Sequence, residues 1–403
     1  MMENRRKVYL IGACRTPIGK MGGALAGVSA VELGATVIRE AINRANVPAE
    51  QVDHVYMGCV IQAGLGQNVA RQAALKAGLP ATTTAQTVNV VCGSGLDSVN
   101  AAARMIQSGD ADVVVAGGME NMSAAPFAMM NGRYGYKMGS PMVNTPLVDT
   151  MVNDALWDAM NNYHMGITAE NVAEQWSLTR QELDTFAAAS QQKASSAIAA
   201  GAFCEEIVPV VIKGRKGDTV ISEDEGPRPG TTAESLAKLR PAFKKDGMVT
   251  AGNSSTINDG AAAVVLVSEE KLLELGLKPQ VEWIGGALGG VDPAIMGVGP
   301  VESTKKLLRK LGMTMDEIDL VEANEAFAAQ SIAVARELAI PEEKLNVNGG
   351  AIALGHPVGA SGCRILVTLI HAMKARAVRT GLATLCIGGG MGCSAVIRRC
   401  EEK

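Results

Sequence analysis

The sequence has few aromatic residues, few histidines and no closely spaced cysteine pair. Aromatic residues make up 3% of the 403 residues, and the four histidines do not form an HExxH pattern. No CxxC pair occurs among the eight cysteines, so we expect no structural zinc site. A GxGxxG segment after a strand and a GxxxxGKS or GxxxxGKT segment are also missing. The usual signatures of nicotinamide binding and of nucleotide hydrolysis are therefore lacking.

The sequence also lacks a basic region and a long apolar run. Its formal net charge is −4 and no long Lys/Arg run occurs, so we expect no nucleic-acid partner. No unbroken apolar run of 18 residues occurs, and we expect no membrane association. The first segment, "MMENRRKVYLIGACRTP", has no signal-peptide cleavage site. These features favour a cytoplasmic protein whose cysteines stay reduced.

Small apolar residues and glycine are abundant instead. The chain is 47% hydrophobic and contains 45 glycines, which indicates a core of Ala, Val, Ile and Met with closely approaching backbones. Strand-like and helix-like segments alternate. They begin with an expected strand over 7–12 and a helix over 31–45, and they continue with "HVYMGCV", "QNVARQAALKAG", "AQTVNVV", "LDSVNAAARMIQSG" and "ADVVVAGGM". This order predicts an α/β fold with helices on both faces of a largely parallel sheet.

The same order of segments returns near the end of the chain. "TVNVVCGSG" is similar to "LNVNGGAIALGHP", an expected strand and loop, and "ADVVVAGGM" is similar to "LATLCIGGGMG", part of an expected final hairpin. We interpret this as an internal duplication. Residues 1–123 plus 251–278 would form one α/β half, and residues 279–403 the other. Residues 124–250 would be an inserted loop domain that covers a site between the halves.

Four residues that can carry chemistry follow expected strands. They are Cys92 in "VVCGSG", Asn324 in "EANEAF", His356 in "LGHPVGASG" and Cys386 in "LCIGGGMG". Each of them also has an ordinary structural explanation on its own. Cys92 can be a packed core thiol, Asn324 a helix cap and His356 a loop residue, and the segment with Cys386 can be a tight turn. Together they supply a nucleophile, a base and an orienting amide at strand ends, where α/β folds build their sites. A helix dipole would acidify Cys92.

Seven segments in order resemble the thiolase family, and most closely its short-chain biosynthetic type. They are "VVCGSGLDSVNAA", "AGGMENMS", "YHMGITAENVAE", "TAGNSSTINDGAA", "NEAFAAQ", "NVNGGAIALGHPVGASG" and "LCIGGGMG". The resemblance covers nearly the whole chain. It implies the duplicated thiolase fold, with five layers in the order helix–sheet–helix–sheet–helix. It also implies a reversible condensation of two acetyl-CoA molecules to acetoacetyl-CoA and CoA, without a metal or other cofactor. A homotetramer assembled through "AAPFAMMNGRYGYKMGSPMVNT" is implied as well.

The resemblance also assigns roles to individual residues. Cys92 would be the acylated nucleophile, and His356 would take its proton. Cys386 would remove the α-proton of the second acetyl-CoA. Asn324 would hold a water that completes one oxyanion hole with His356. The backbone N–H groups of Cys92 and Gly388 would form the other hole.

The family pattern further implies a coenzyme A and acyl pocket. Its expected members are Ser255, Arg228, Ser235, His164, Met165, Leu156, Phe243, Ala251, Ala326, Phe327 and Met296. Outside this set, we expect His371 to be a surface residue.

Three other readings stay open from the sequence. A ketoacyl synthase would share the duplicated fold and one cysteine, but it would not need Cys386 as a base. A degradative thiolase for longer acyl chains would differ in the pocket, where "HMG" and Met296 favour a short acyl group. A non-catalytic acyl-CoA carrier or a redox sensor would not require all four candidate residues.

Overall fold

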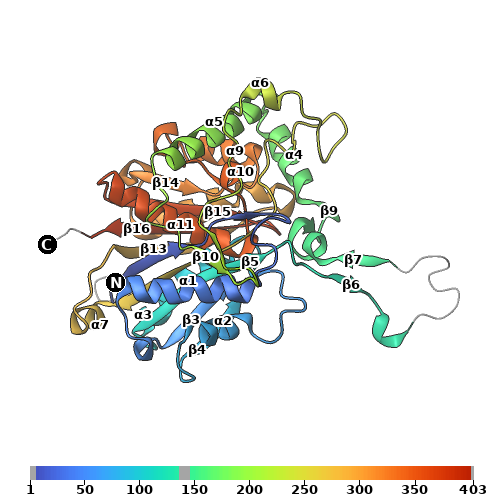
Figure 1. Ribbon diagram of the computed structural model, residues 1–403. Coiled ribbons are helices and arrows are strands. Elements are labelled where there is room, and N and C mark those ends of the chain that lie inside the picture. The colour runs from blue at the N-terminus through green and yellow to red at the C-terminus, as the bar shows by residue number, and fades with distance from the viewer. Residues whose placement is uncertain (1–5, 136–145, 401–403) are drawn as a thin grey trace.

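The computed structural model describes residues 6–135 and 146–400, and Figure 1 shows their arrangement. The main sheet contains β1 (Val8–Arg15), β2 (Gly19–Lys20), β3 (His54–Gly58), β4 (Thr84–Val88), β5 (Val113–Asn121), β12 (Asn258–Ser268), β13 (Val281–Gly290), β14 (Leu320–Ala323), β15 (Thr380–Ile387) and β16 (Met391–Arg399). Separate hairpins are formed by β6 (Phe127–Met129) with β7 (Leu147–Asp149), β8 (Trp157–Asp158) with β9 (Tyr163–His164), and β10 (Val210–Ile212) with β11 (Thr219–Ile221).

The described residues also form eleven α-helices. They are α1 (Ala30–Ala45), α2 (Val69–Ala77), α3 (Ser94–Ser108), α4 (Met165–Gln175), α5 (Arg180–Ala199), α6 (Ala233–Leu236), α7 (Glu269–Glu274), α8 (Gly299–Leu311), α9 (Ala328–Glu337), α10 (Ala351–Leu354) and α11 (Val358–Ala375). No helix of the described residues is long and apolar enough to cross a membrane.

The main sheet is mixed, with the strand order β14–β15–β16–β13–β1–β12–β5–β3–β4. Strand β3 pairs in parallel with β4 and β5, and β14 pairs in parallel with β15. All other neighbours in this order are antiparallel. The expected largely parallel sheet is therefore wrong. Strand β12 returns between β1 and β5, and the β15–β16 hairpin adds further antiparallel pairs.

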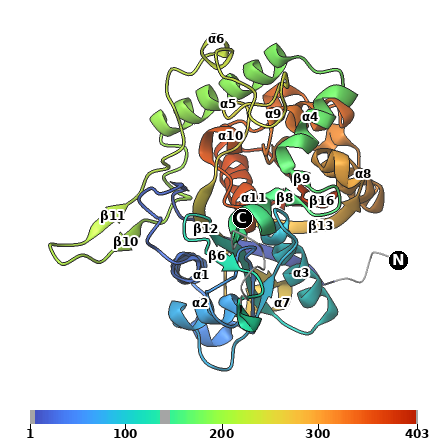
Figure 2. The same ribbon diagram turned by 90° about the vertical axis from the view of Figure 1, so that its right-hand side faces the viewer.

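The helices and the two halves of this sheet together form five layers. Helices α3 and α11 pack on each other and contact strands of both halves, so they form the central layer. Helices α1 and α2 cover the other face of the N-terminal strands, and α8 covers β13 and β16 (Figures 1 and 2). The five-layered arrangement predicted from the family resemblance is confirmed.

Strand β12 shows how the sequence produces two cores. It is buried along its whole length, because both of its faces are covered by helices. Successive side chains of a strand point to opposite faces. Ala261, Ala263 and Val265 thus join the outer core under α1, and Ala262, Val264 and Leu266 join the central core with α3 and α11.

The expected strand in "LNVNGG" is wrong. Leu345 makes only an isolated bridge to Val321, and the chain then turns into α10. Asn346 (φ 43°) and Gly349 (φ 80°) adopt left-handed conformations, which interrupt an extended strand. The side chain of Asn346 bonds both the N–H and the C=O of Ala323 at 2.9 and 2.8 Å. A side-chain amide thus replaces the backbone pairing of a strand.

The segment between the halves contributes both a cover and projecting hairpins. Helices α4 and α5 pack on α9, and α5 also packs on α10. Figure 1 shows the β6–β7 hairpin extending away from the body, and Figure 2 shows the β10–β11 hairpin doing so on another side. Residues 136–145 of the expected tetramerisation segment lie outside the described residues. The division at 123/124, 250/251 and 278/279 stays a prediction.

Candidate active site

Cys92 lies on a sharp turn between β4 and α3. Strand β4 ends at Val88, and Val91 has a φ of 45°, a conformation that is costly for a β-branched residue. The Ser94 hydroxyl closes the turn, since it accepts from Val90 N–H at 2.9 Å and donates to Val91 C=O at 2.7 Å. The turn places the thiol just before the N-cap of α3, where the sequence predicted it.

The resting thiol of Cys92 is not acidified. Burial raises its pKa to about 11, while the backbone N–H groups of Gly388 and of Cys92 itself act in the opposite direction. The expected acidification by the helix dipole is wrong, because the desolvation cost of a thiolate outweighs these dipoles. The same two N–H groups contact the Cys92 sulfur, and their expected role in an oxyanion hole stays a prediction.

His356 lies between α10 and α11 in a buried, neutral state. Burial, and secondarily the positive charge of Arg364, lower its pKa to about 3. Its Nδ1 atom is 2.6 Å from Ser361 Oγ, and the Ser361 hydroxyl donates to Pro357 C=O at 2.9 Å. The tautomer with its proton on Nδ1 lets Ser361 accept from the ring and donate to Pro357 C=O, and it places the lone pair on Nε2. That Nε2 atom has no hydrogen-bond partner among the described residues.

Asn324 follows β14 and is fully buried. Its Nδ2 atom lies 3.4 Å from His356 Nδ1, and its Oδ1 atom has no partner among the described residues. A buried amide oxygen without a partner is a typical position for a bound water.

Cys386 lies near the end of β15, and Gly388 begins the turn between β15 and β16. Cys386 is fully buried, and its pKa is raised first by burial and then by the neighbouring Cys92 thiol. Gly389 and Gly390 have φ values of 88° and 85°, so the turn requires glycine to bring the Gly388 N–H to the Cys92 sulfur.

One cavity of about 660 Å³ brings these residues together. The predicted residues that line it are Cys92, His356, Cys386, Gly388, Ser255, Arg228, His164, Met165, Leu156, Phe243, Ala251, Ala326, Phe327 and Met296. Phe243 stacks on His164 with ring centres 4.7 Å apart and meets the edge of Phe327 at 6.2 Å. Asn324 lies behind His356 and does not line the cavity.

Ser235 and His371 both lie outside this cavity. Ser235 is exposed at the N-terminus of α6, where its hydroxyl bonds Thr232 C=O at 2.7 Å, and it does not line the cavity. Its role in coenzyme A binding stays a prediction. His371 in α11 is partly exposed, with Nε2 3.1 Å from Ala13 C=O.

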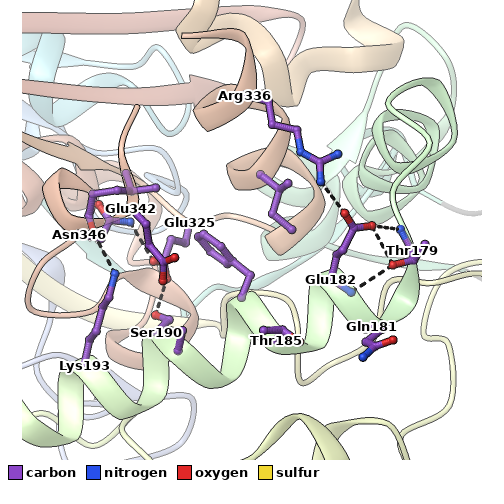
Figure 3. Close-up of a pocket in the computed structure, with 14 residues that line it drawn as sticks. Thr179, Gln181, Glu182, Thr185, Ser190, Lys193, Glu325, Arg336, Glu342 and Asn346 are labelled. Carbon is purple, nitrogen blue, oxygen red and sulfur yellow. Dashed lines mark hydrogen bonds and ion pairs between the residues drawn. The ribbon is translucent and has the colours of Figure 1, made fainter. Parts of the chain in front are cut away.

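A second pocket, of about 390 Å³, lies between α5, α9 and the segment before α10 (Figure 3). None of the predicted site residues lines it. Glu325, which follows Asn324 in the chain, reaches into it and accepts from Ser190 Oγ at 2.6 Å and Asn346 Nδ2 at 2.8 Å. This pocket is therefore separate from the two thiols. Within residues 6–135 and 146–400, no group of three or more His, Cys, Asp or Glu side chains is arranged to hold a metal ion.

Sequence reasoning missed three residues that support the site. Ser361 orients the His356 ring, and Asn258 Oδ1 accepts from the His356 backbone N–H at 3.0 Å. Glu120 accepts from Gly359 N–H in the first turn of α11. Ser361 lies one helical turn beyond His356 and could have been found from that spacing. Asn258 and Glu120 lie in the segments "TAGNSSTINDGAA" and "AGGMENMS", but their contacts with the residues around His356 join distant parts of the chain.

Comparison with known proteins gives the family. Residues 8–270 match the family profile "Thiolase, N-terminal domain", and residues 277–399 match "Thiolase, C-terminal domain". The chain belongs to the thiolase family. This thiolase is 57% identical to an acetyl-CoA acetyltransferase of Syntrophomonas wolfei over 394 residues, which cover 97% of this chain and 99% of that one. It is 56% identical over 395 residues to an acetyl-CoA acetyltransferase of Escherichia coli, with 98% and 99% of the chains covered.

Solved structures show the same fold. The crystal structure of the Bacillus anthracis acetyl-CoA acetyltransferase superposes on this thiolase with a TM-score of 0.95 at 46% identity, covering 98% of this chain and 99% of that chain. The structure of the acetyl-CoA acetyltransferase from Syntrophomonas wolfei gives a TM-score of 0.96 at 40% identity, with 98% and 100% covered.

Proposed function

We propose that this thiolase is an acetyl-CoA C-acetyltransferase that reversibly condenses two acetyl-CoA molecules to acetoacetyl-CoA and CoA. One observation carries the proposal: the thiols of Cys92 and Cys386 line one cavity with His356. One thiol can hold an acyl group while the other exchanges a proton with a second thioester. The names of the relatives from Syntrophomonas wolfei and Escherichia coli support the same reaction.

In the first half-reaction, the Cys92 sulfur attacks the carbonyl carbon of acetyl-CoA, and His356 Nε2 takes the thiol proton. The N–H groups of Cys92 and Gly388 stabilise the oxyanion that forms. The carbon–sulfur bond to CoA then breaks, and the Cys386 thiol protonates the departing CoA thiolate. The acetyl group stays on Cys92, Cys386 becomes a thiolate, and His356 becomes an imidazolium.

In the second half-reaction, the Cys386 thiolate removes an α-proton from a second acetyl-CoA. The enolate oxygen is stabilised by the His356 imidazolium and by a water bound at Asn324, whose unpartnered Oδ1 supports this assignment. The enolate carbon attacks acetyl-Cys92, a carbon–carbon bond forms, and the bond to the Cys92 sulfur breaks. His356 returns its proton to Cys92, so all three residues regain their starting states. In this proposal no resident cofactor takes part.

A short acyl group fits the surroundings of Cys386. Met165, Met296, Ala326 and Phe327 pack with it in one apolar cluster, which limits the room for a longer chain. The test is cleavage of acetoacetyl-CoA and of 3-ketooctanoyl-CoA by free CoA. Rapid cleavage of the C4 substrate alone supports the proposal. Comparable cleavage of both indicates a degradative thiolase of broader range, and cleavage of neither by folded, reduced protein contradicts the proposal.

We also propose that the protein is a cytoplasmic homotetramer with no nucleic-acid or membrane partner. All eight cysteines are free thiols, which suits a reducing compartment. The projecting β6–β7 hairpin exposes Phe127, Met129 and Leu147, and a second copy of the chain can cover them. Light scattering at working concentration tests the tetramer, and a dimer mass contradicts it.

A further inference from the structure

The carboxylate of Glu120 is buried among backbone N–H groups. Glu120 is the residue before last in β5 and is fully buried. Its Oε2 atom accepts from Val60 N–H at 3.0 Å and from Gly359 N–H at 2.9 Å, and its Oε1 atom accepts from Ile61 N–H at 3.1 Å. Burial raises the pKa of Glu120 to about 7, and these three N–H groups act in the opposite direction. Three dipoles from the main chain thus stabilise its anionic form.

These N–H groups belong to segments from the two halves of the fold. Val60 and Ile61 follow β3 in the N-terminal half. Gly359 is in the first turn of α11 in the C-terminal half, three residues after His356. A single carboxylate therefore ties the loop after β3 to the helix that begins beside His356.

The backbones at this junction approach too closely for side chains. A Cβ atom at Gly118, two residues before Glu120, would collide with Gly359 C=O. A Cβ atom at Gly95, in the first turn of the helix that follows Cys92, would lie 2.7 Å from the backbone N of Cys363 in α11. The starts of α3 and α11 are thus in direct contact. A shift of the first turn of α11 changes the position of His356 relative to Cys92.

We propose that Glu120 is a positioning residue of the thiolase reaction, acting through His356 and Cys92. The inference rests on the proposed function. Glu120 does not line the cavity, so it does not act by contact with substrate. Without its second acceptor oxygen, at least one buried N–H loses its partner and faces a donor, which shifts the loop after β3 relative to α11. A displacement of about 1 Å between reacting groups can lower a rate about 10²-fold.

Glu170 in α4 provides a matched control. It is also buried, and it accepts from Met248 N–H and Val249 N–H at 2.9 Å each. Like Glu120, it is a buried side chain that accepts from backbone N–H groups. These groups belong to the loop before Ala251, however, and not to the helix beside His356.

The test compares Glu120→Gln with Glu170→Gln in the thiolysis of acetoacetyl-CoA. Glutamine keeps the shape but turns one acceptor oxygen into a donor, so we expect both variants to lower Tm. We expect Glu120→Gln to lower kcat about 10- to 100-fold with a KM for CoA within about 3-fold of the native value. Glu170→Gln should keep kcat. An equal loss of kcat in both variants, or no loss in Glu120→Gln, overturns the proposal.

Hydrogen exchange tests the same positioning without relying on activity. In Glu120→Gln, peptides that contain residues 58–61 and 356–360 should exchange faster than in the native protein and in Glu170→Gln. If the native protein does not cleave acetoacetyl-CoA, the proposed function fails. Unchanged exchange in both peptides overturns the positioning role. If Glu120→Gln does not fold, the shorter Glu120→Asp carries both measurements.

Discussion

Ser361, in the first turn of α11, contacts the ring of His356, which lies two residues before that helix. Its Oγ atom lies 2.6 Å from His356 Nδ1 and donates its own proton to Pro357 C=O. With the ring proton on Nδ1, the hydroxyl accepts from the ring while it donates to Pro357, and Nε2 is left as the basic atom. This relationship makes His356 a base toward the cavity.

We expect Ser361→Ala to lower kcat about 10-fold or more, because the ring loses the partner that selects its tautomer. Ser98→Ala is the matched control: Ser98 is buried in α3 and its hydroxyl likewise donates to the carbonyl four residues earlier, Ser94, at 2.8 Å. Steady-state thiolysis of acetoacetyl-CoA measures both. Equal effects of the two substitutions would argue against a tautomer-selecting role for Ser361.

Cys386→Ser should separate the two half-reactions. A serine hydroxyl is a poor base, so we expect kcat of condensation to fall about 10²- to 10⁴-fold. Cys92 remains, and the enzyme should still form acetyl-Cys92, although more slowly because CoA departs without its acid. Condensation is followed by acetoacetyl-CoA formation, and the acetyl-enzyme by the mass of the intact protein. Loss of acetylation together with condensation would show that the first half-reaction already requires Cys386, and it would contradict this separation.

The buried imidazole predicts a pH dependence of stability. The pKa of His356 is about 3 in the folded protein, below its usual 6.5. Below pH 6.5 the unfolded chain binds a proton that the folded chain does not, so the free energy of unfolding decreases as the pH falls toward 3. We expect His356→Gln to lose this contribution. Urea unfolding at several pH values measures it, and identical pH slopes for native and variant proteins would contradict a buried neutral imidazole.

An apolar pair on the β6–β7 hairpin should control assembly. Met129 and Leu147 face each other across the strands and are 55% and 56% exposed. Val211 and Val220 form a similar pair on the β10–β11 hairpin, at 50% and 58%. We expect Met129→Asp to reduce the mass found by light scattering and Val211→Asp to leave it unchanged, because a charge in an apolar contact is costly. A tetramer that persists in Met129→Asp would place the assembly contact elsewhere.

The sequence predicted the features of the site that local patterns encode. A strand, a small-residue turn and a helix located Cys92, and the glycines after Cys386 indicated a turn that exposes backbone N–H groups. Fourteen predicted residues line one cavity, where the loops that follow β4, β14 and β15 meet residues of the segment 124–250.

Other features depend on contacts that no local pattern records. Asn346 replaces strand pairing with its side chain, so an apolar run that resembled a strand is a loop. The pKa of Cys92 follows from burial by distant segments, which outweighs the lowering by the backbone N–H groups of Gly388 and Cys92. Strand β12 lies between β1 and β5 in the sheet, although in the sequence it follows the insert of residues 124–250.

Acetylation of Cys92 tests the central claim most directly. The native protein is mixed with acetyl-CoA alone, quenched in acid and digested, and the peptide containing residues 89–98 is examined by mass spectrometry. We predict one acetyl group on Cys92 that disappears when free CoA is added, because CoA reverses the first half-reaction. A peptide that stays unmodified in folded, reduced protein would contradict the account.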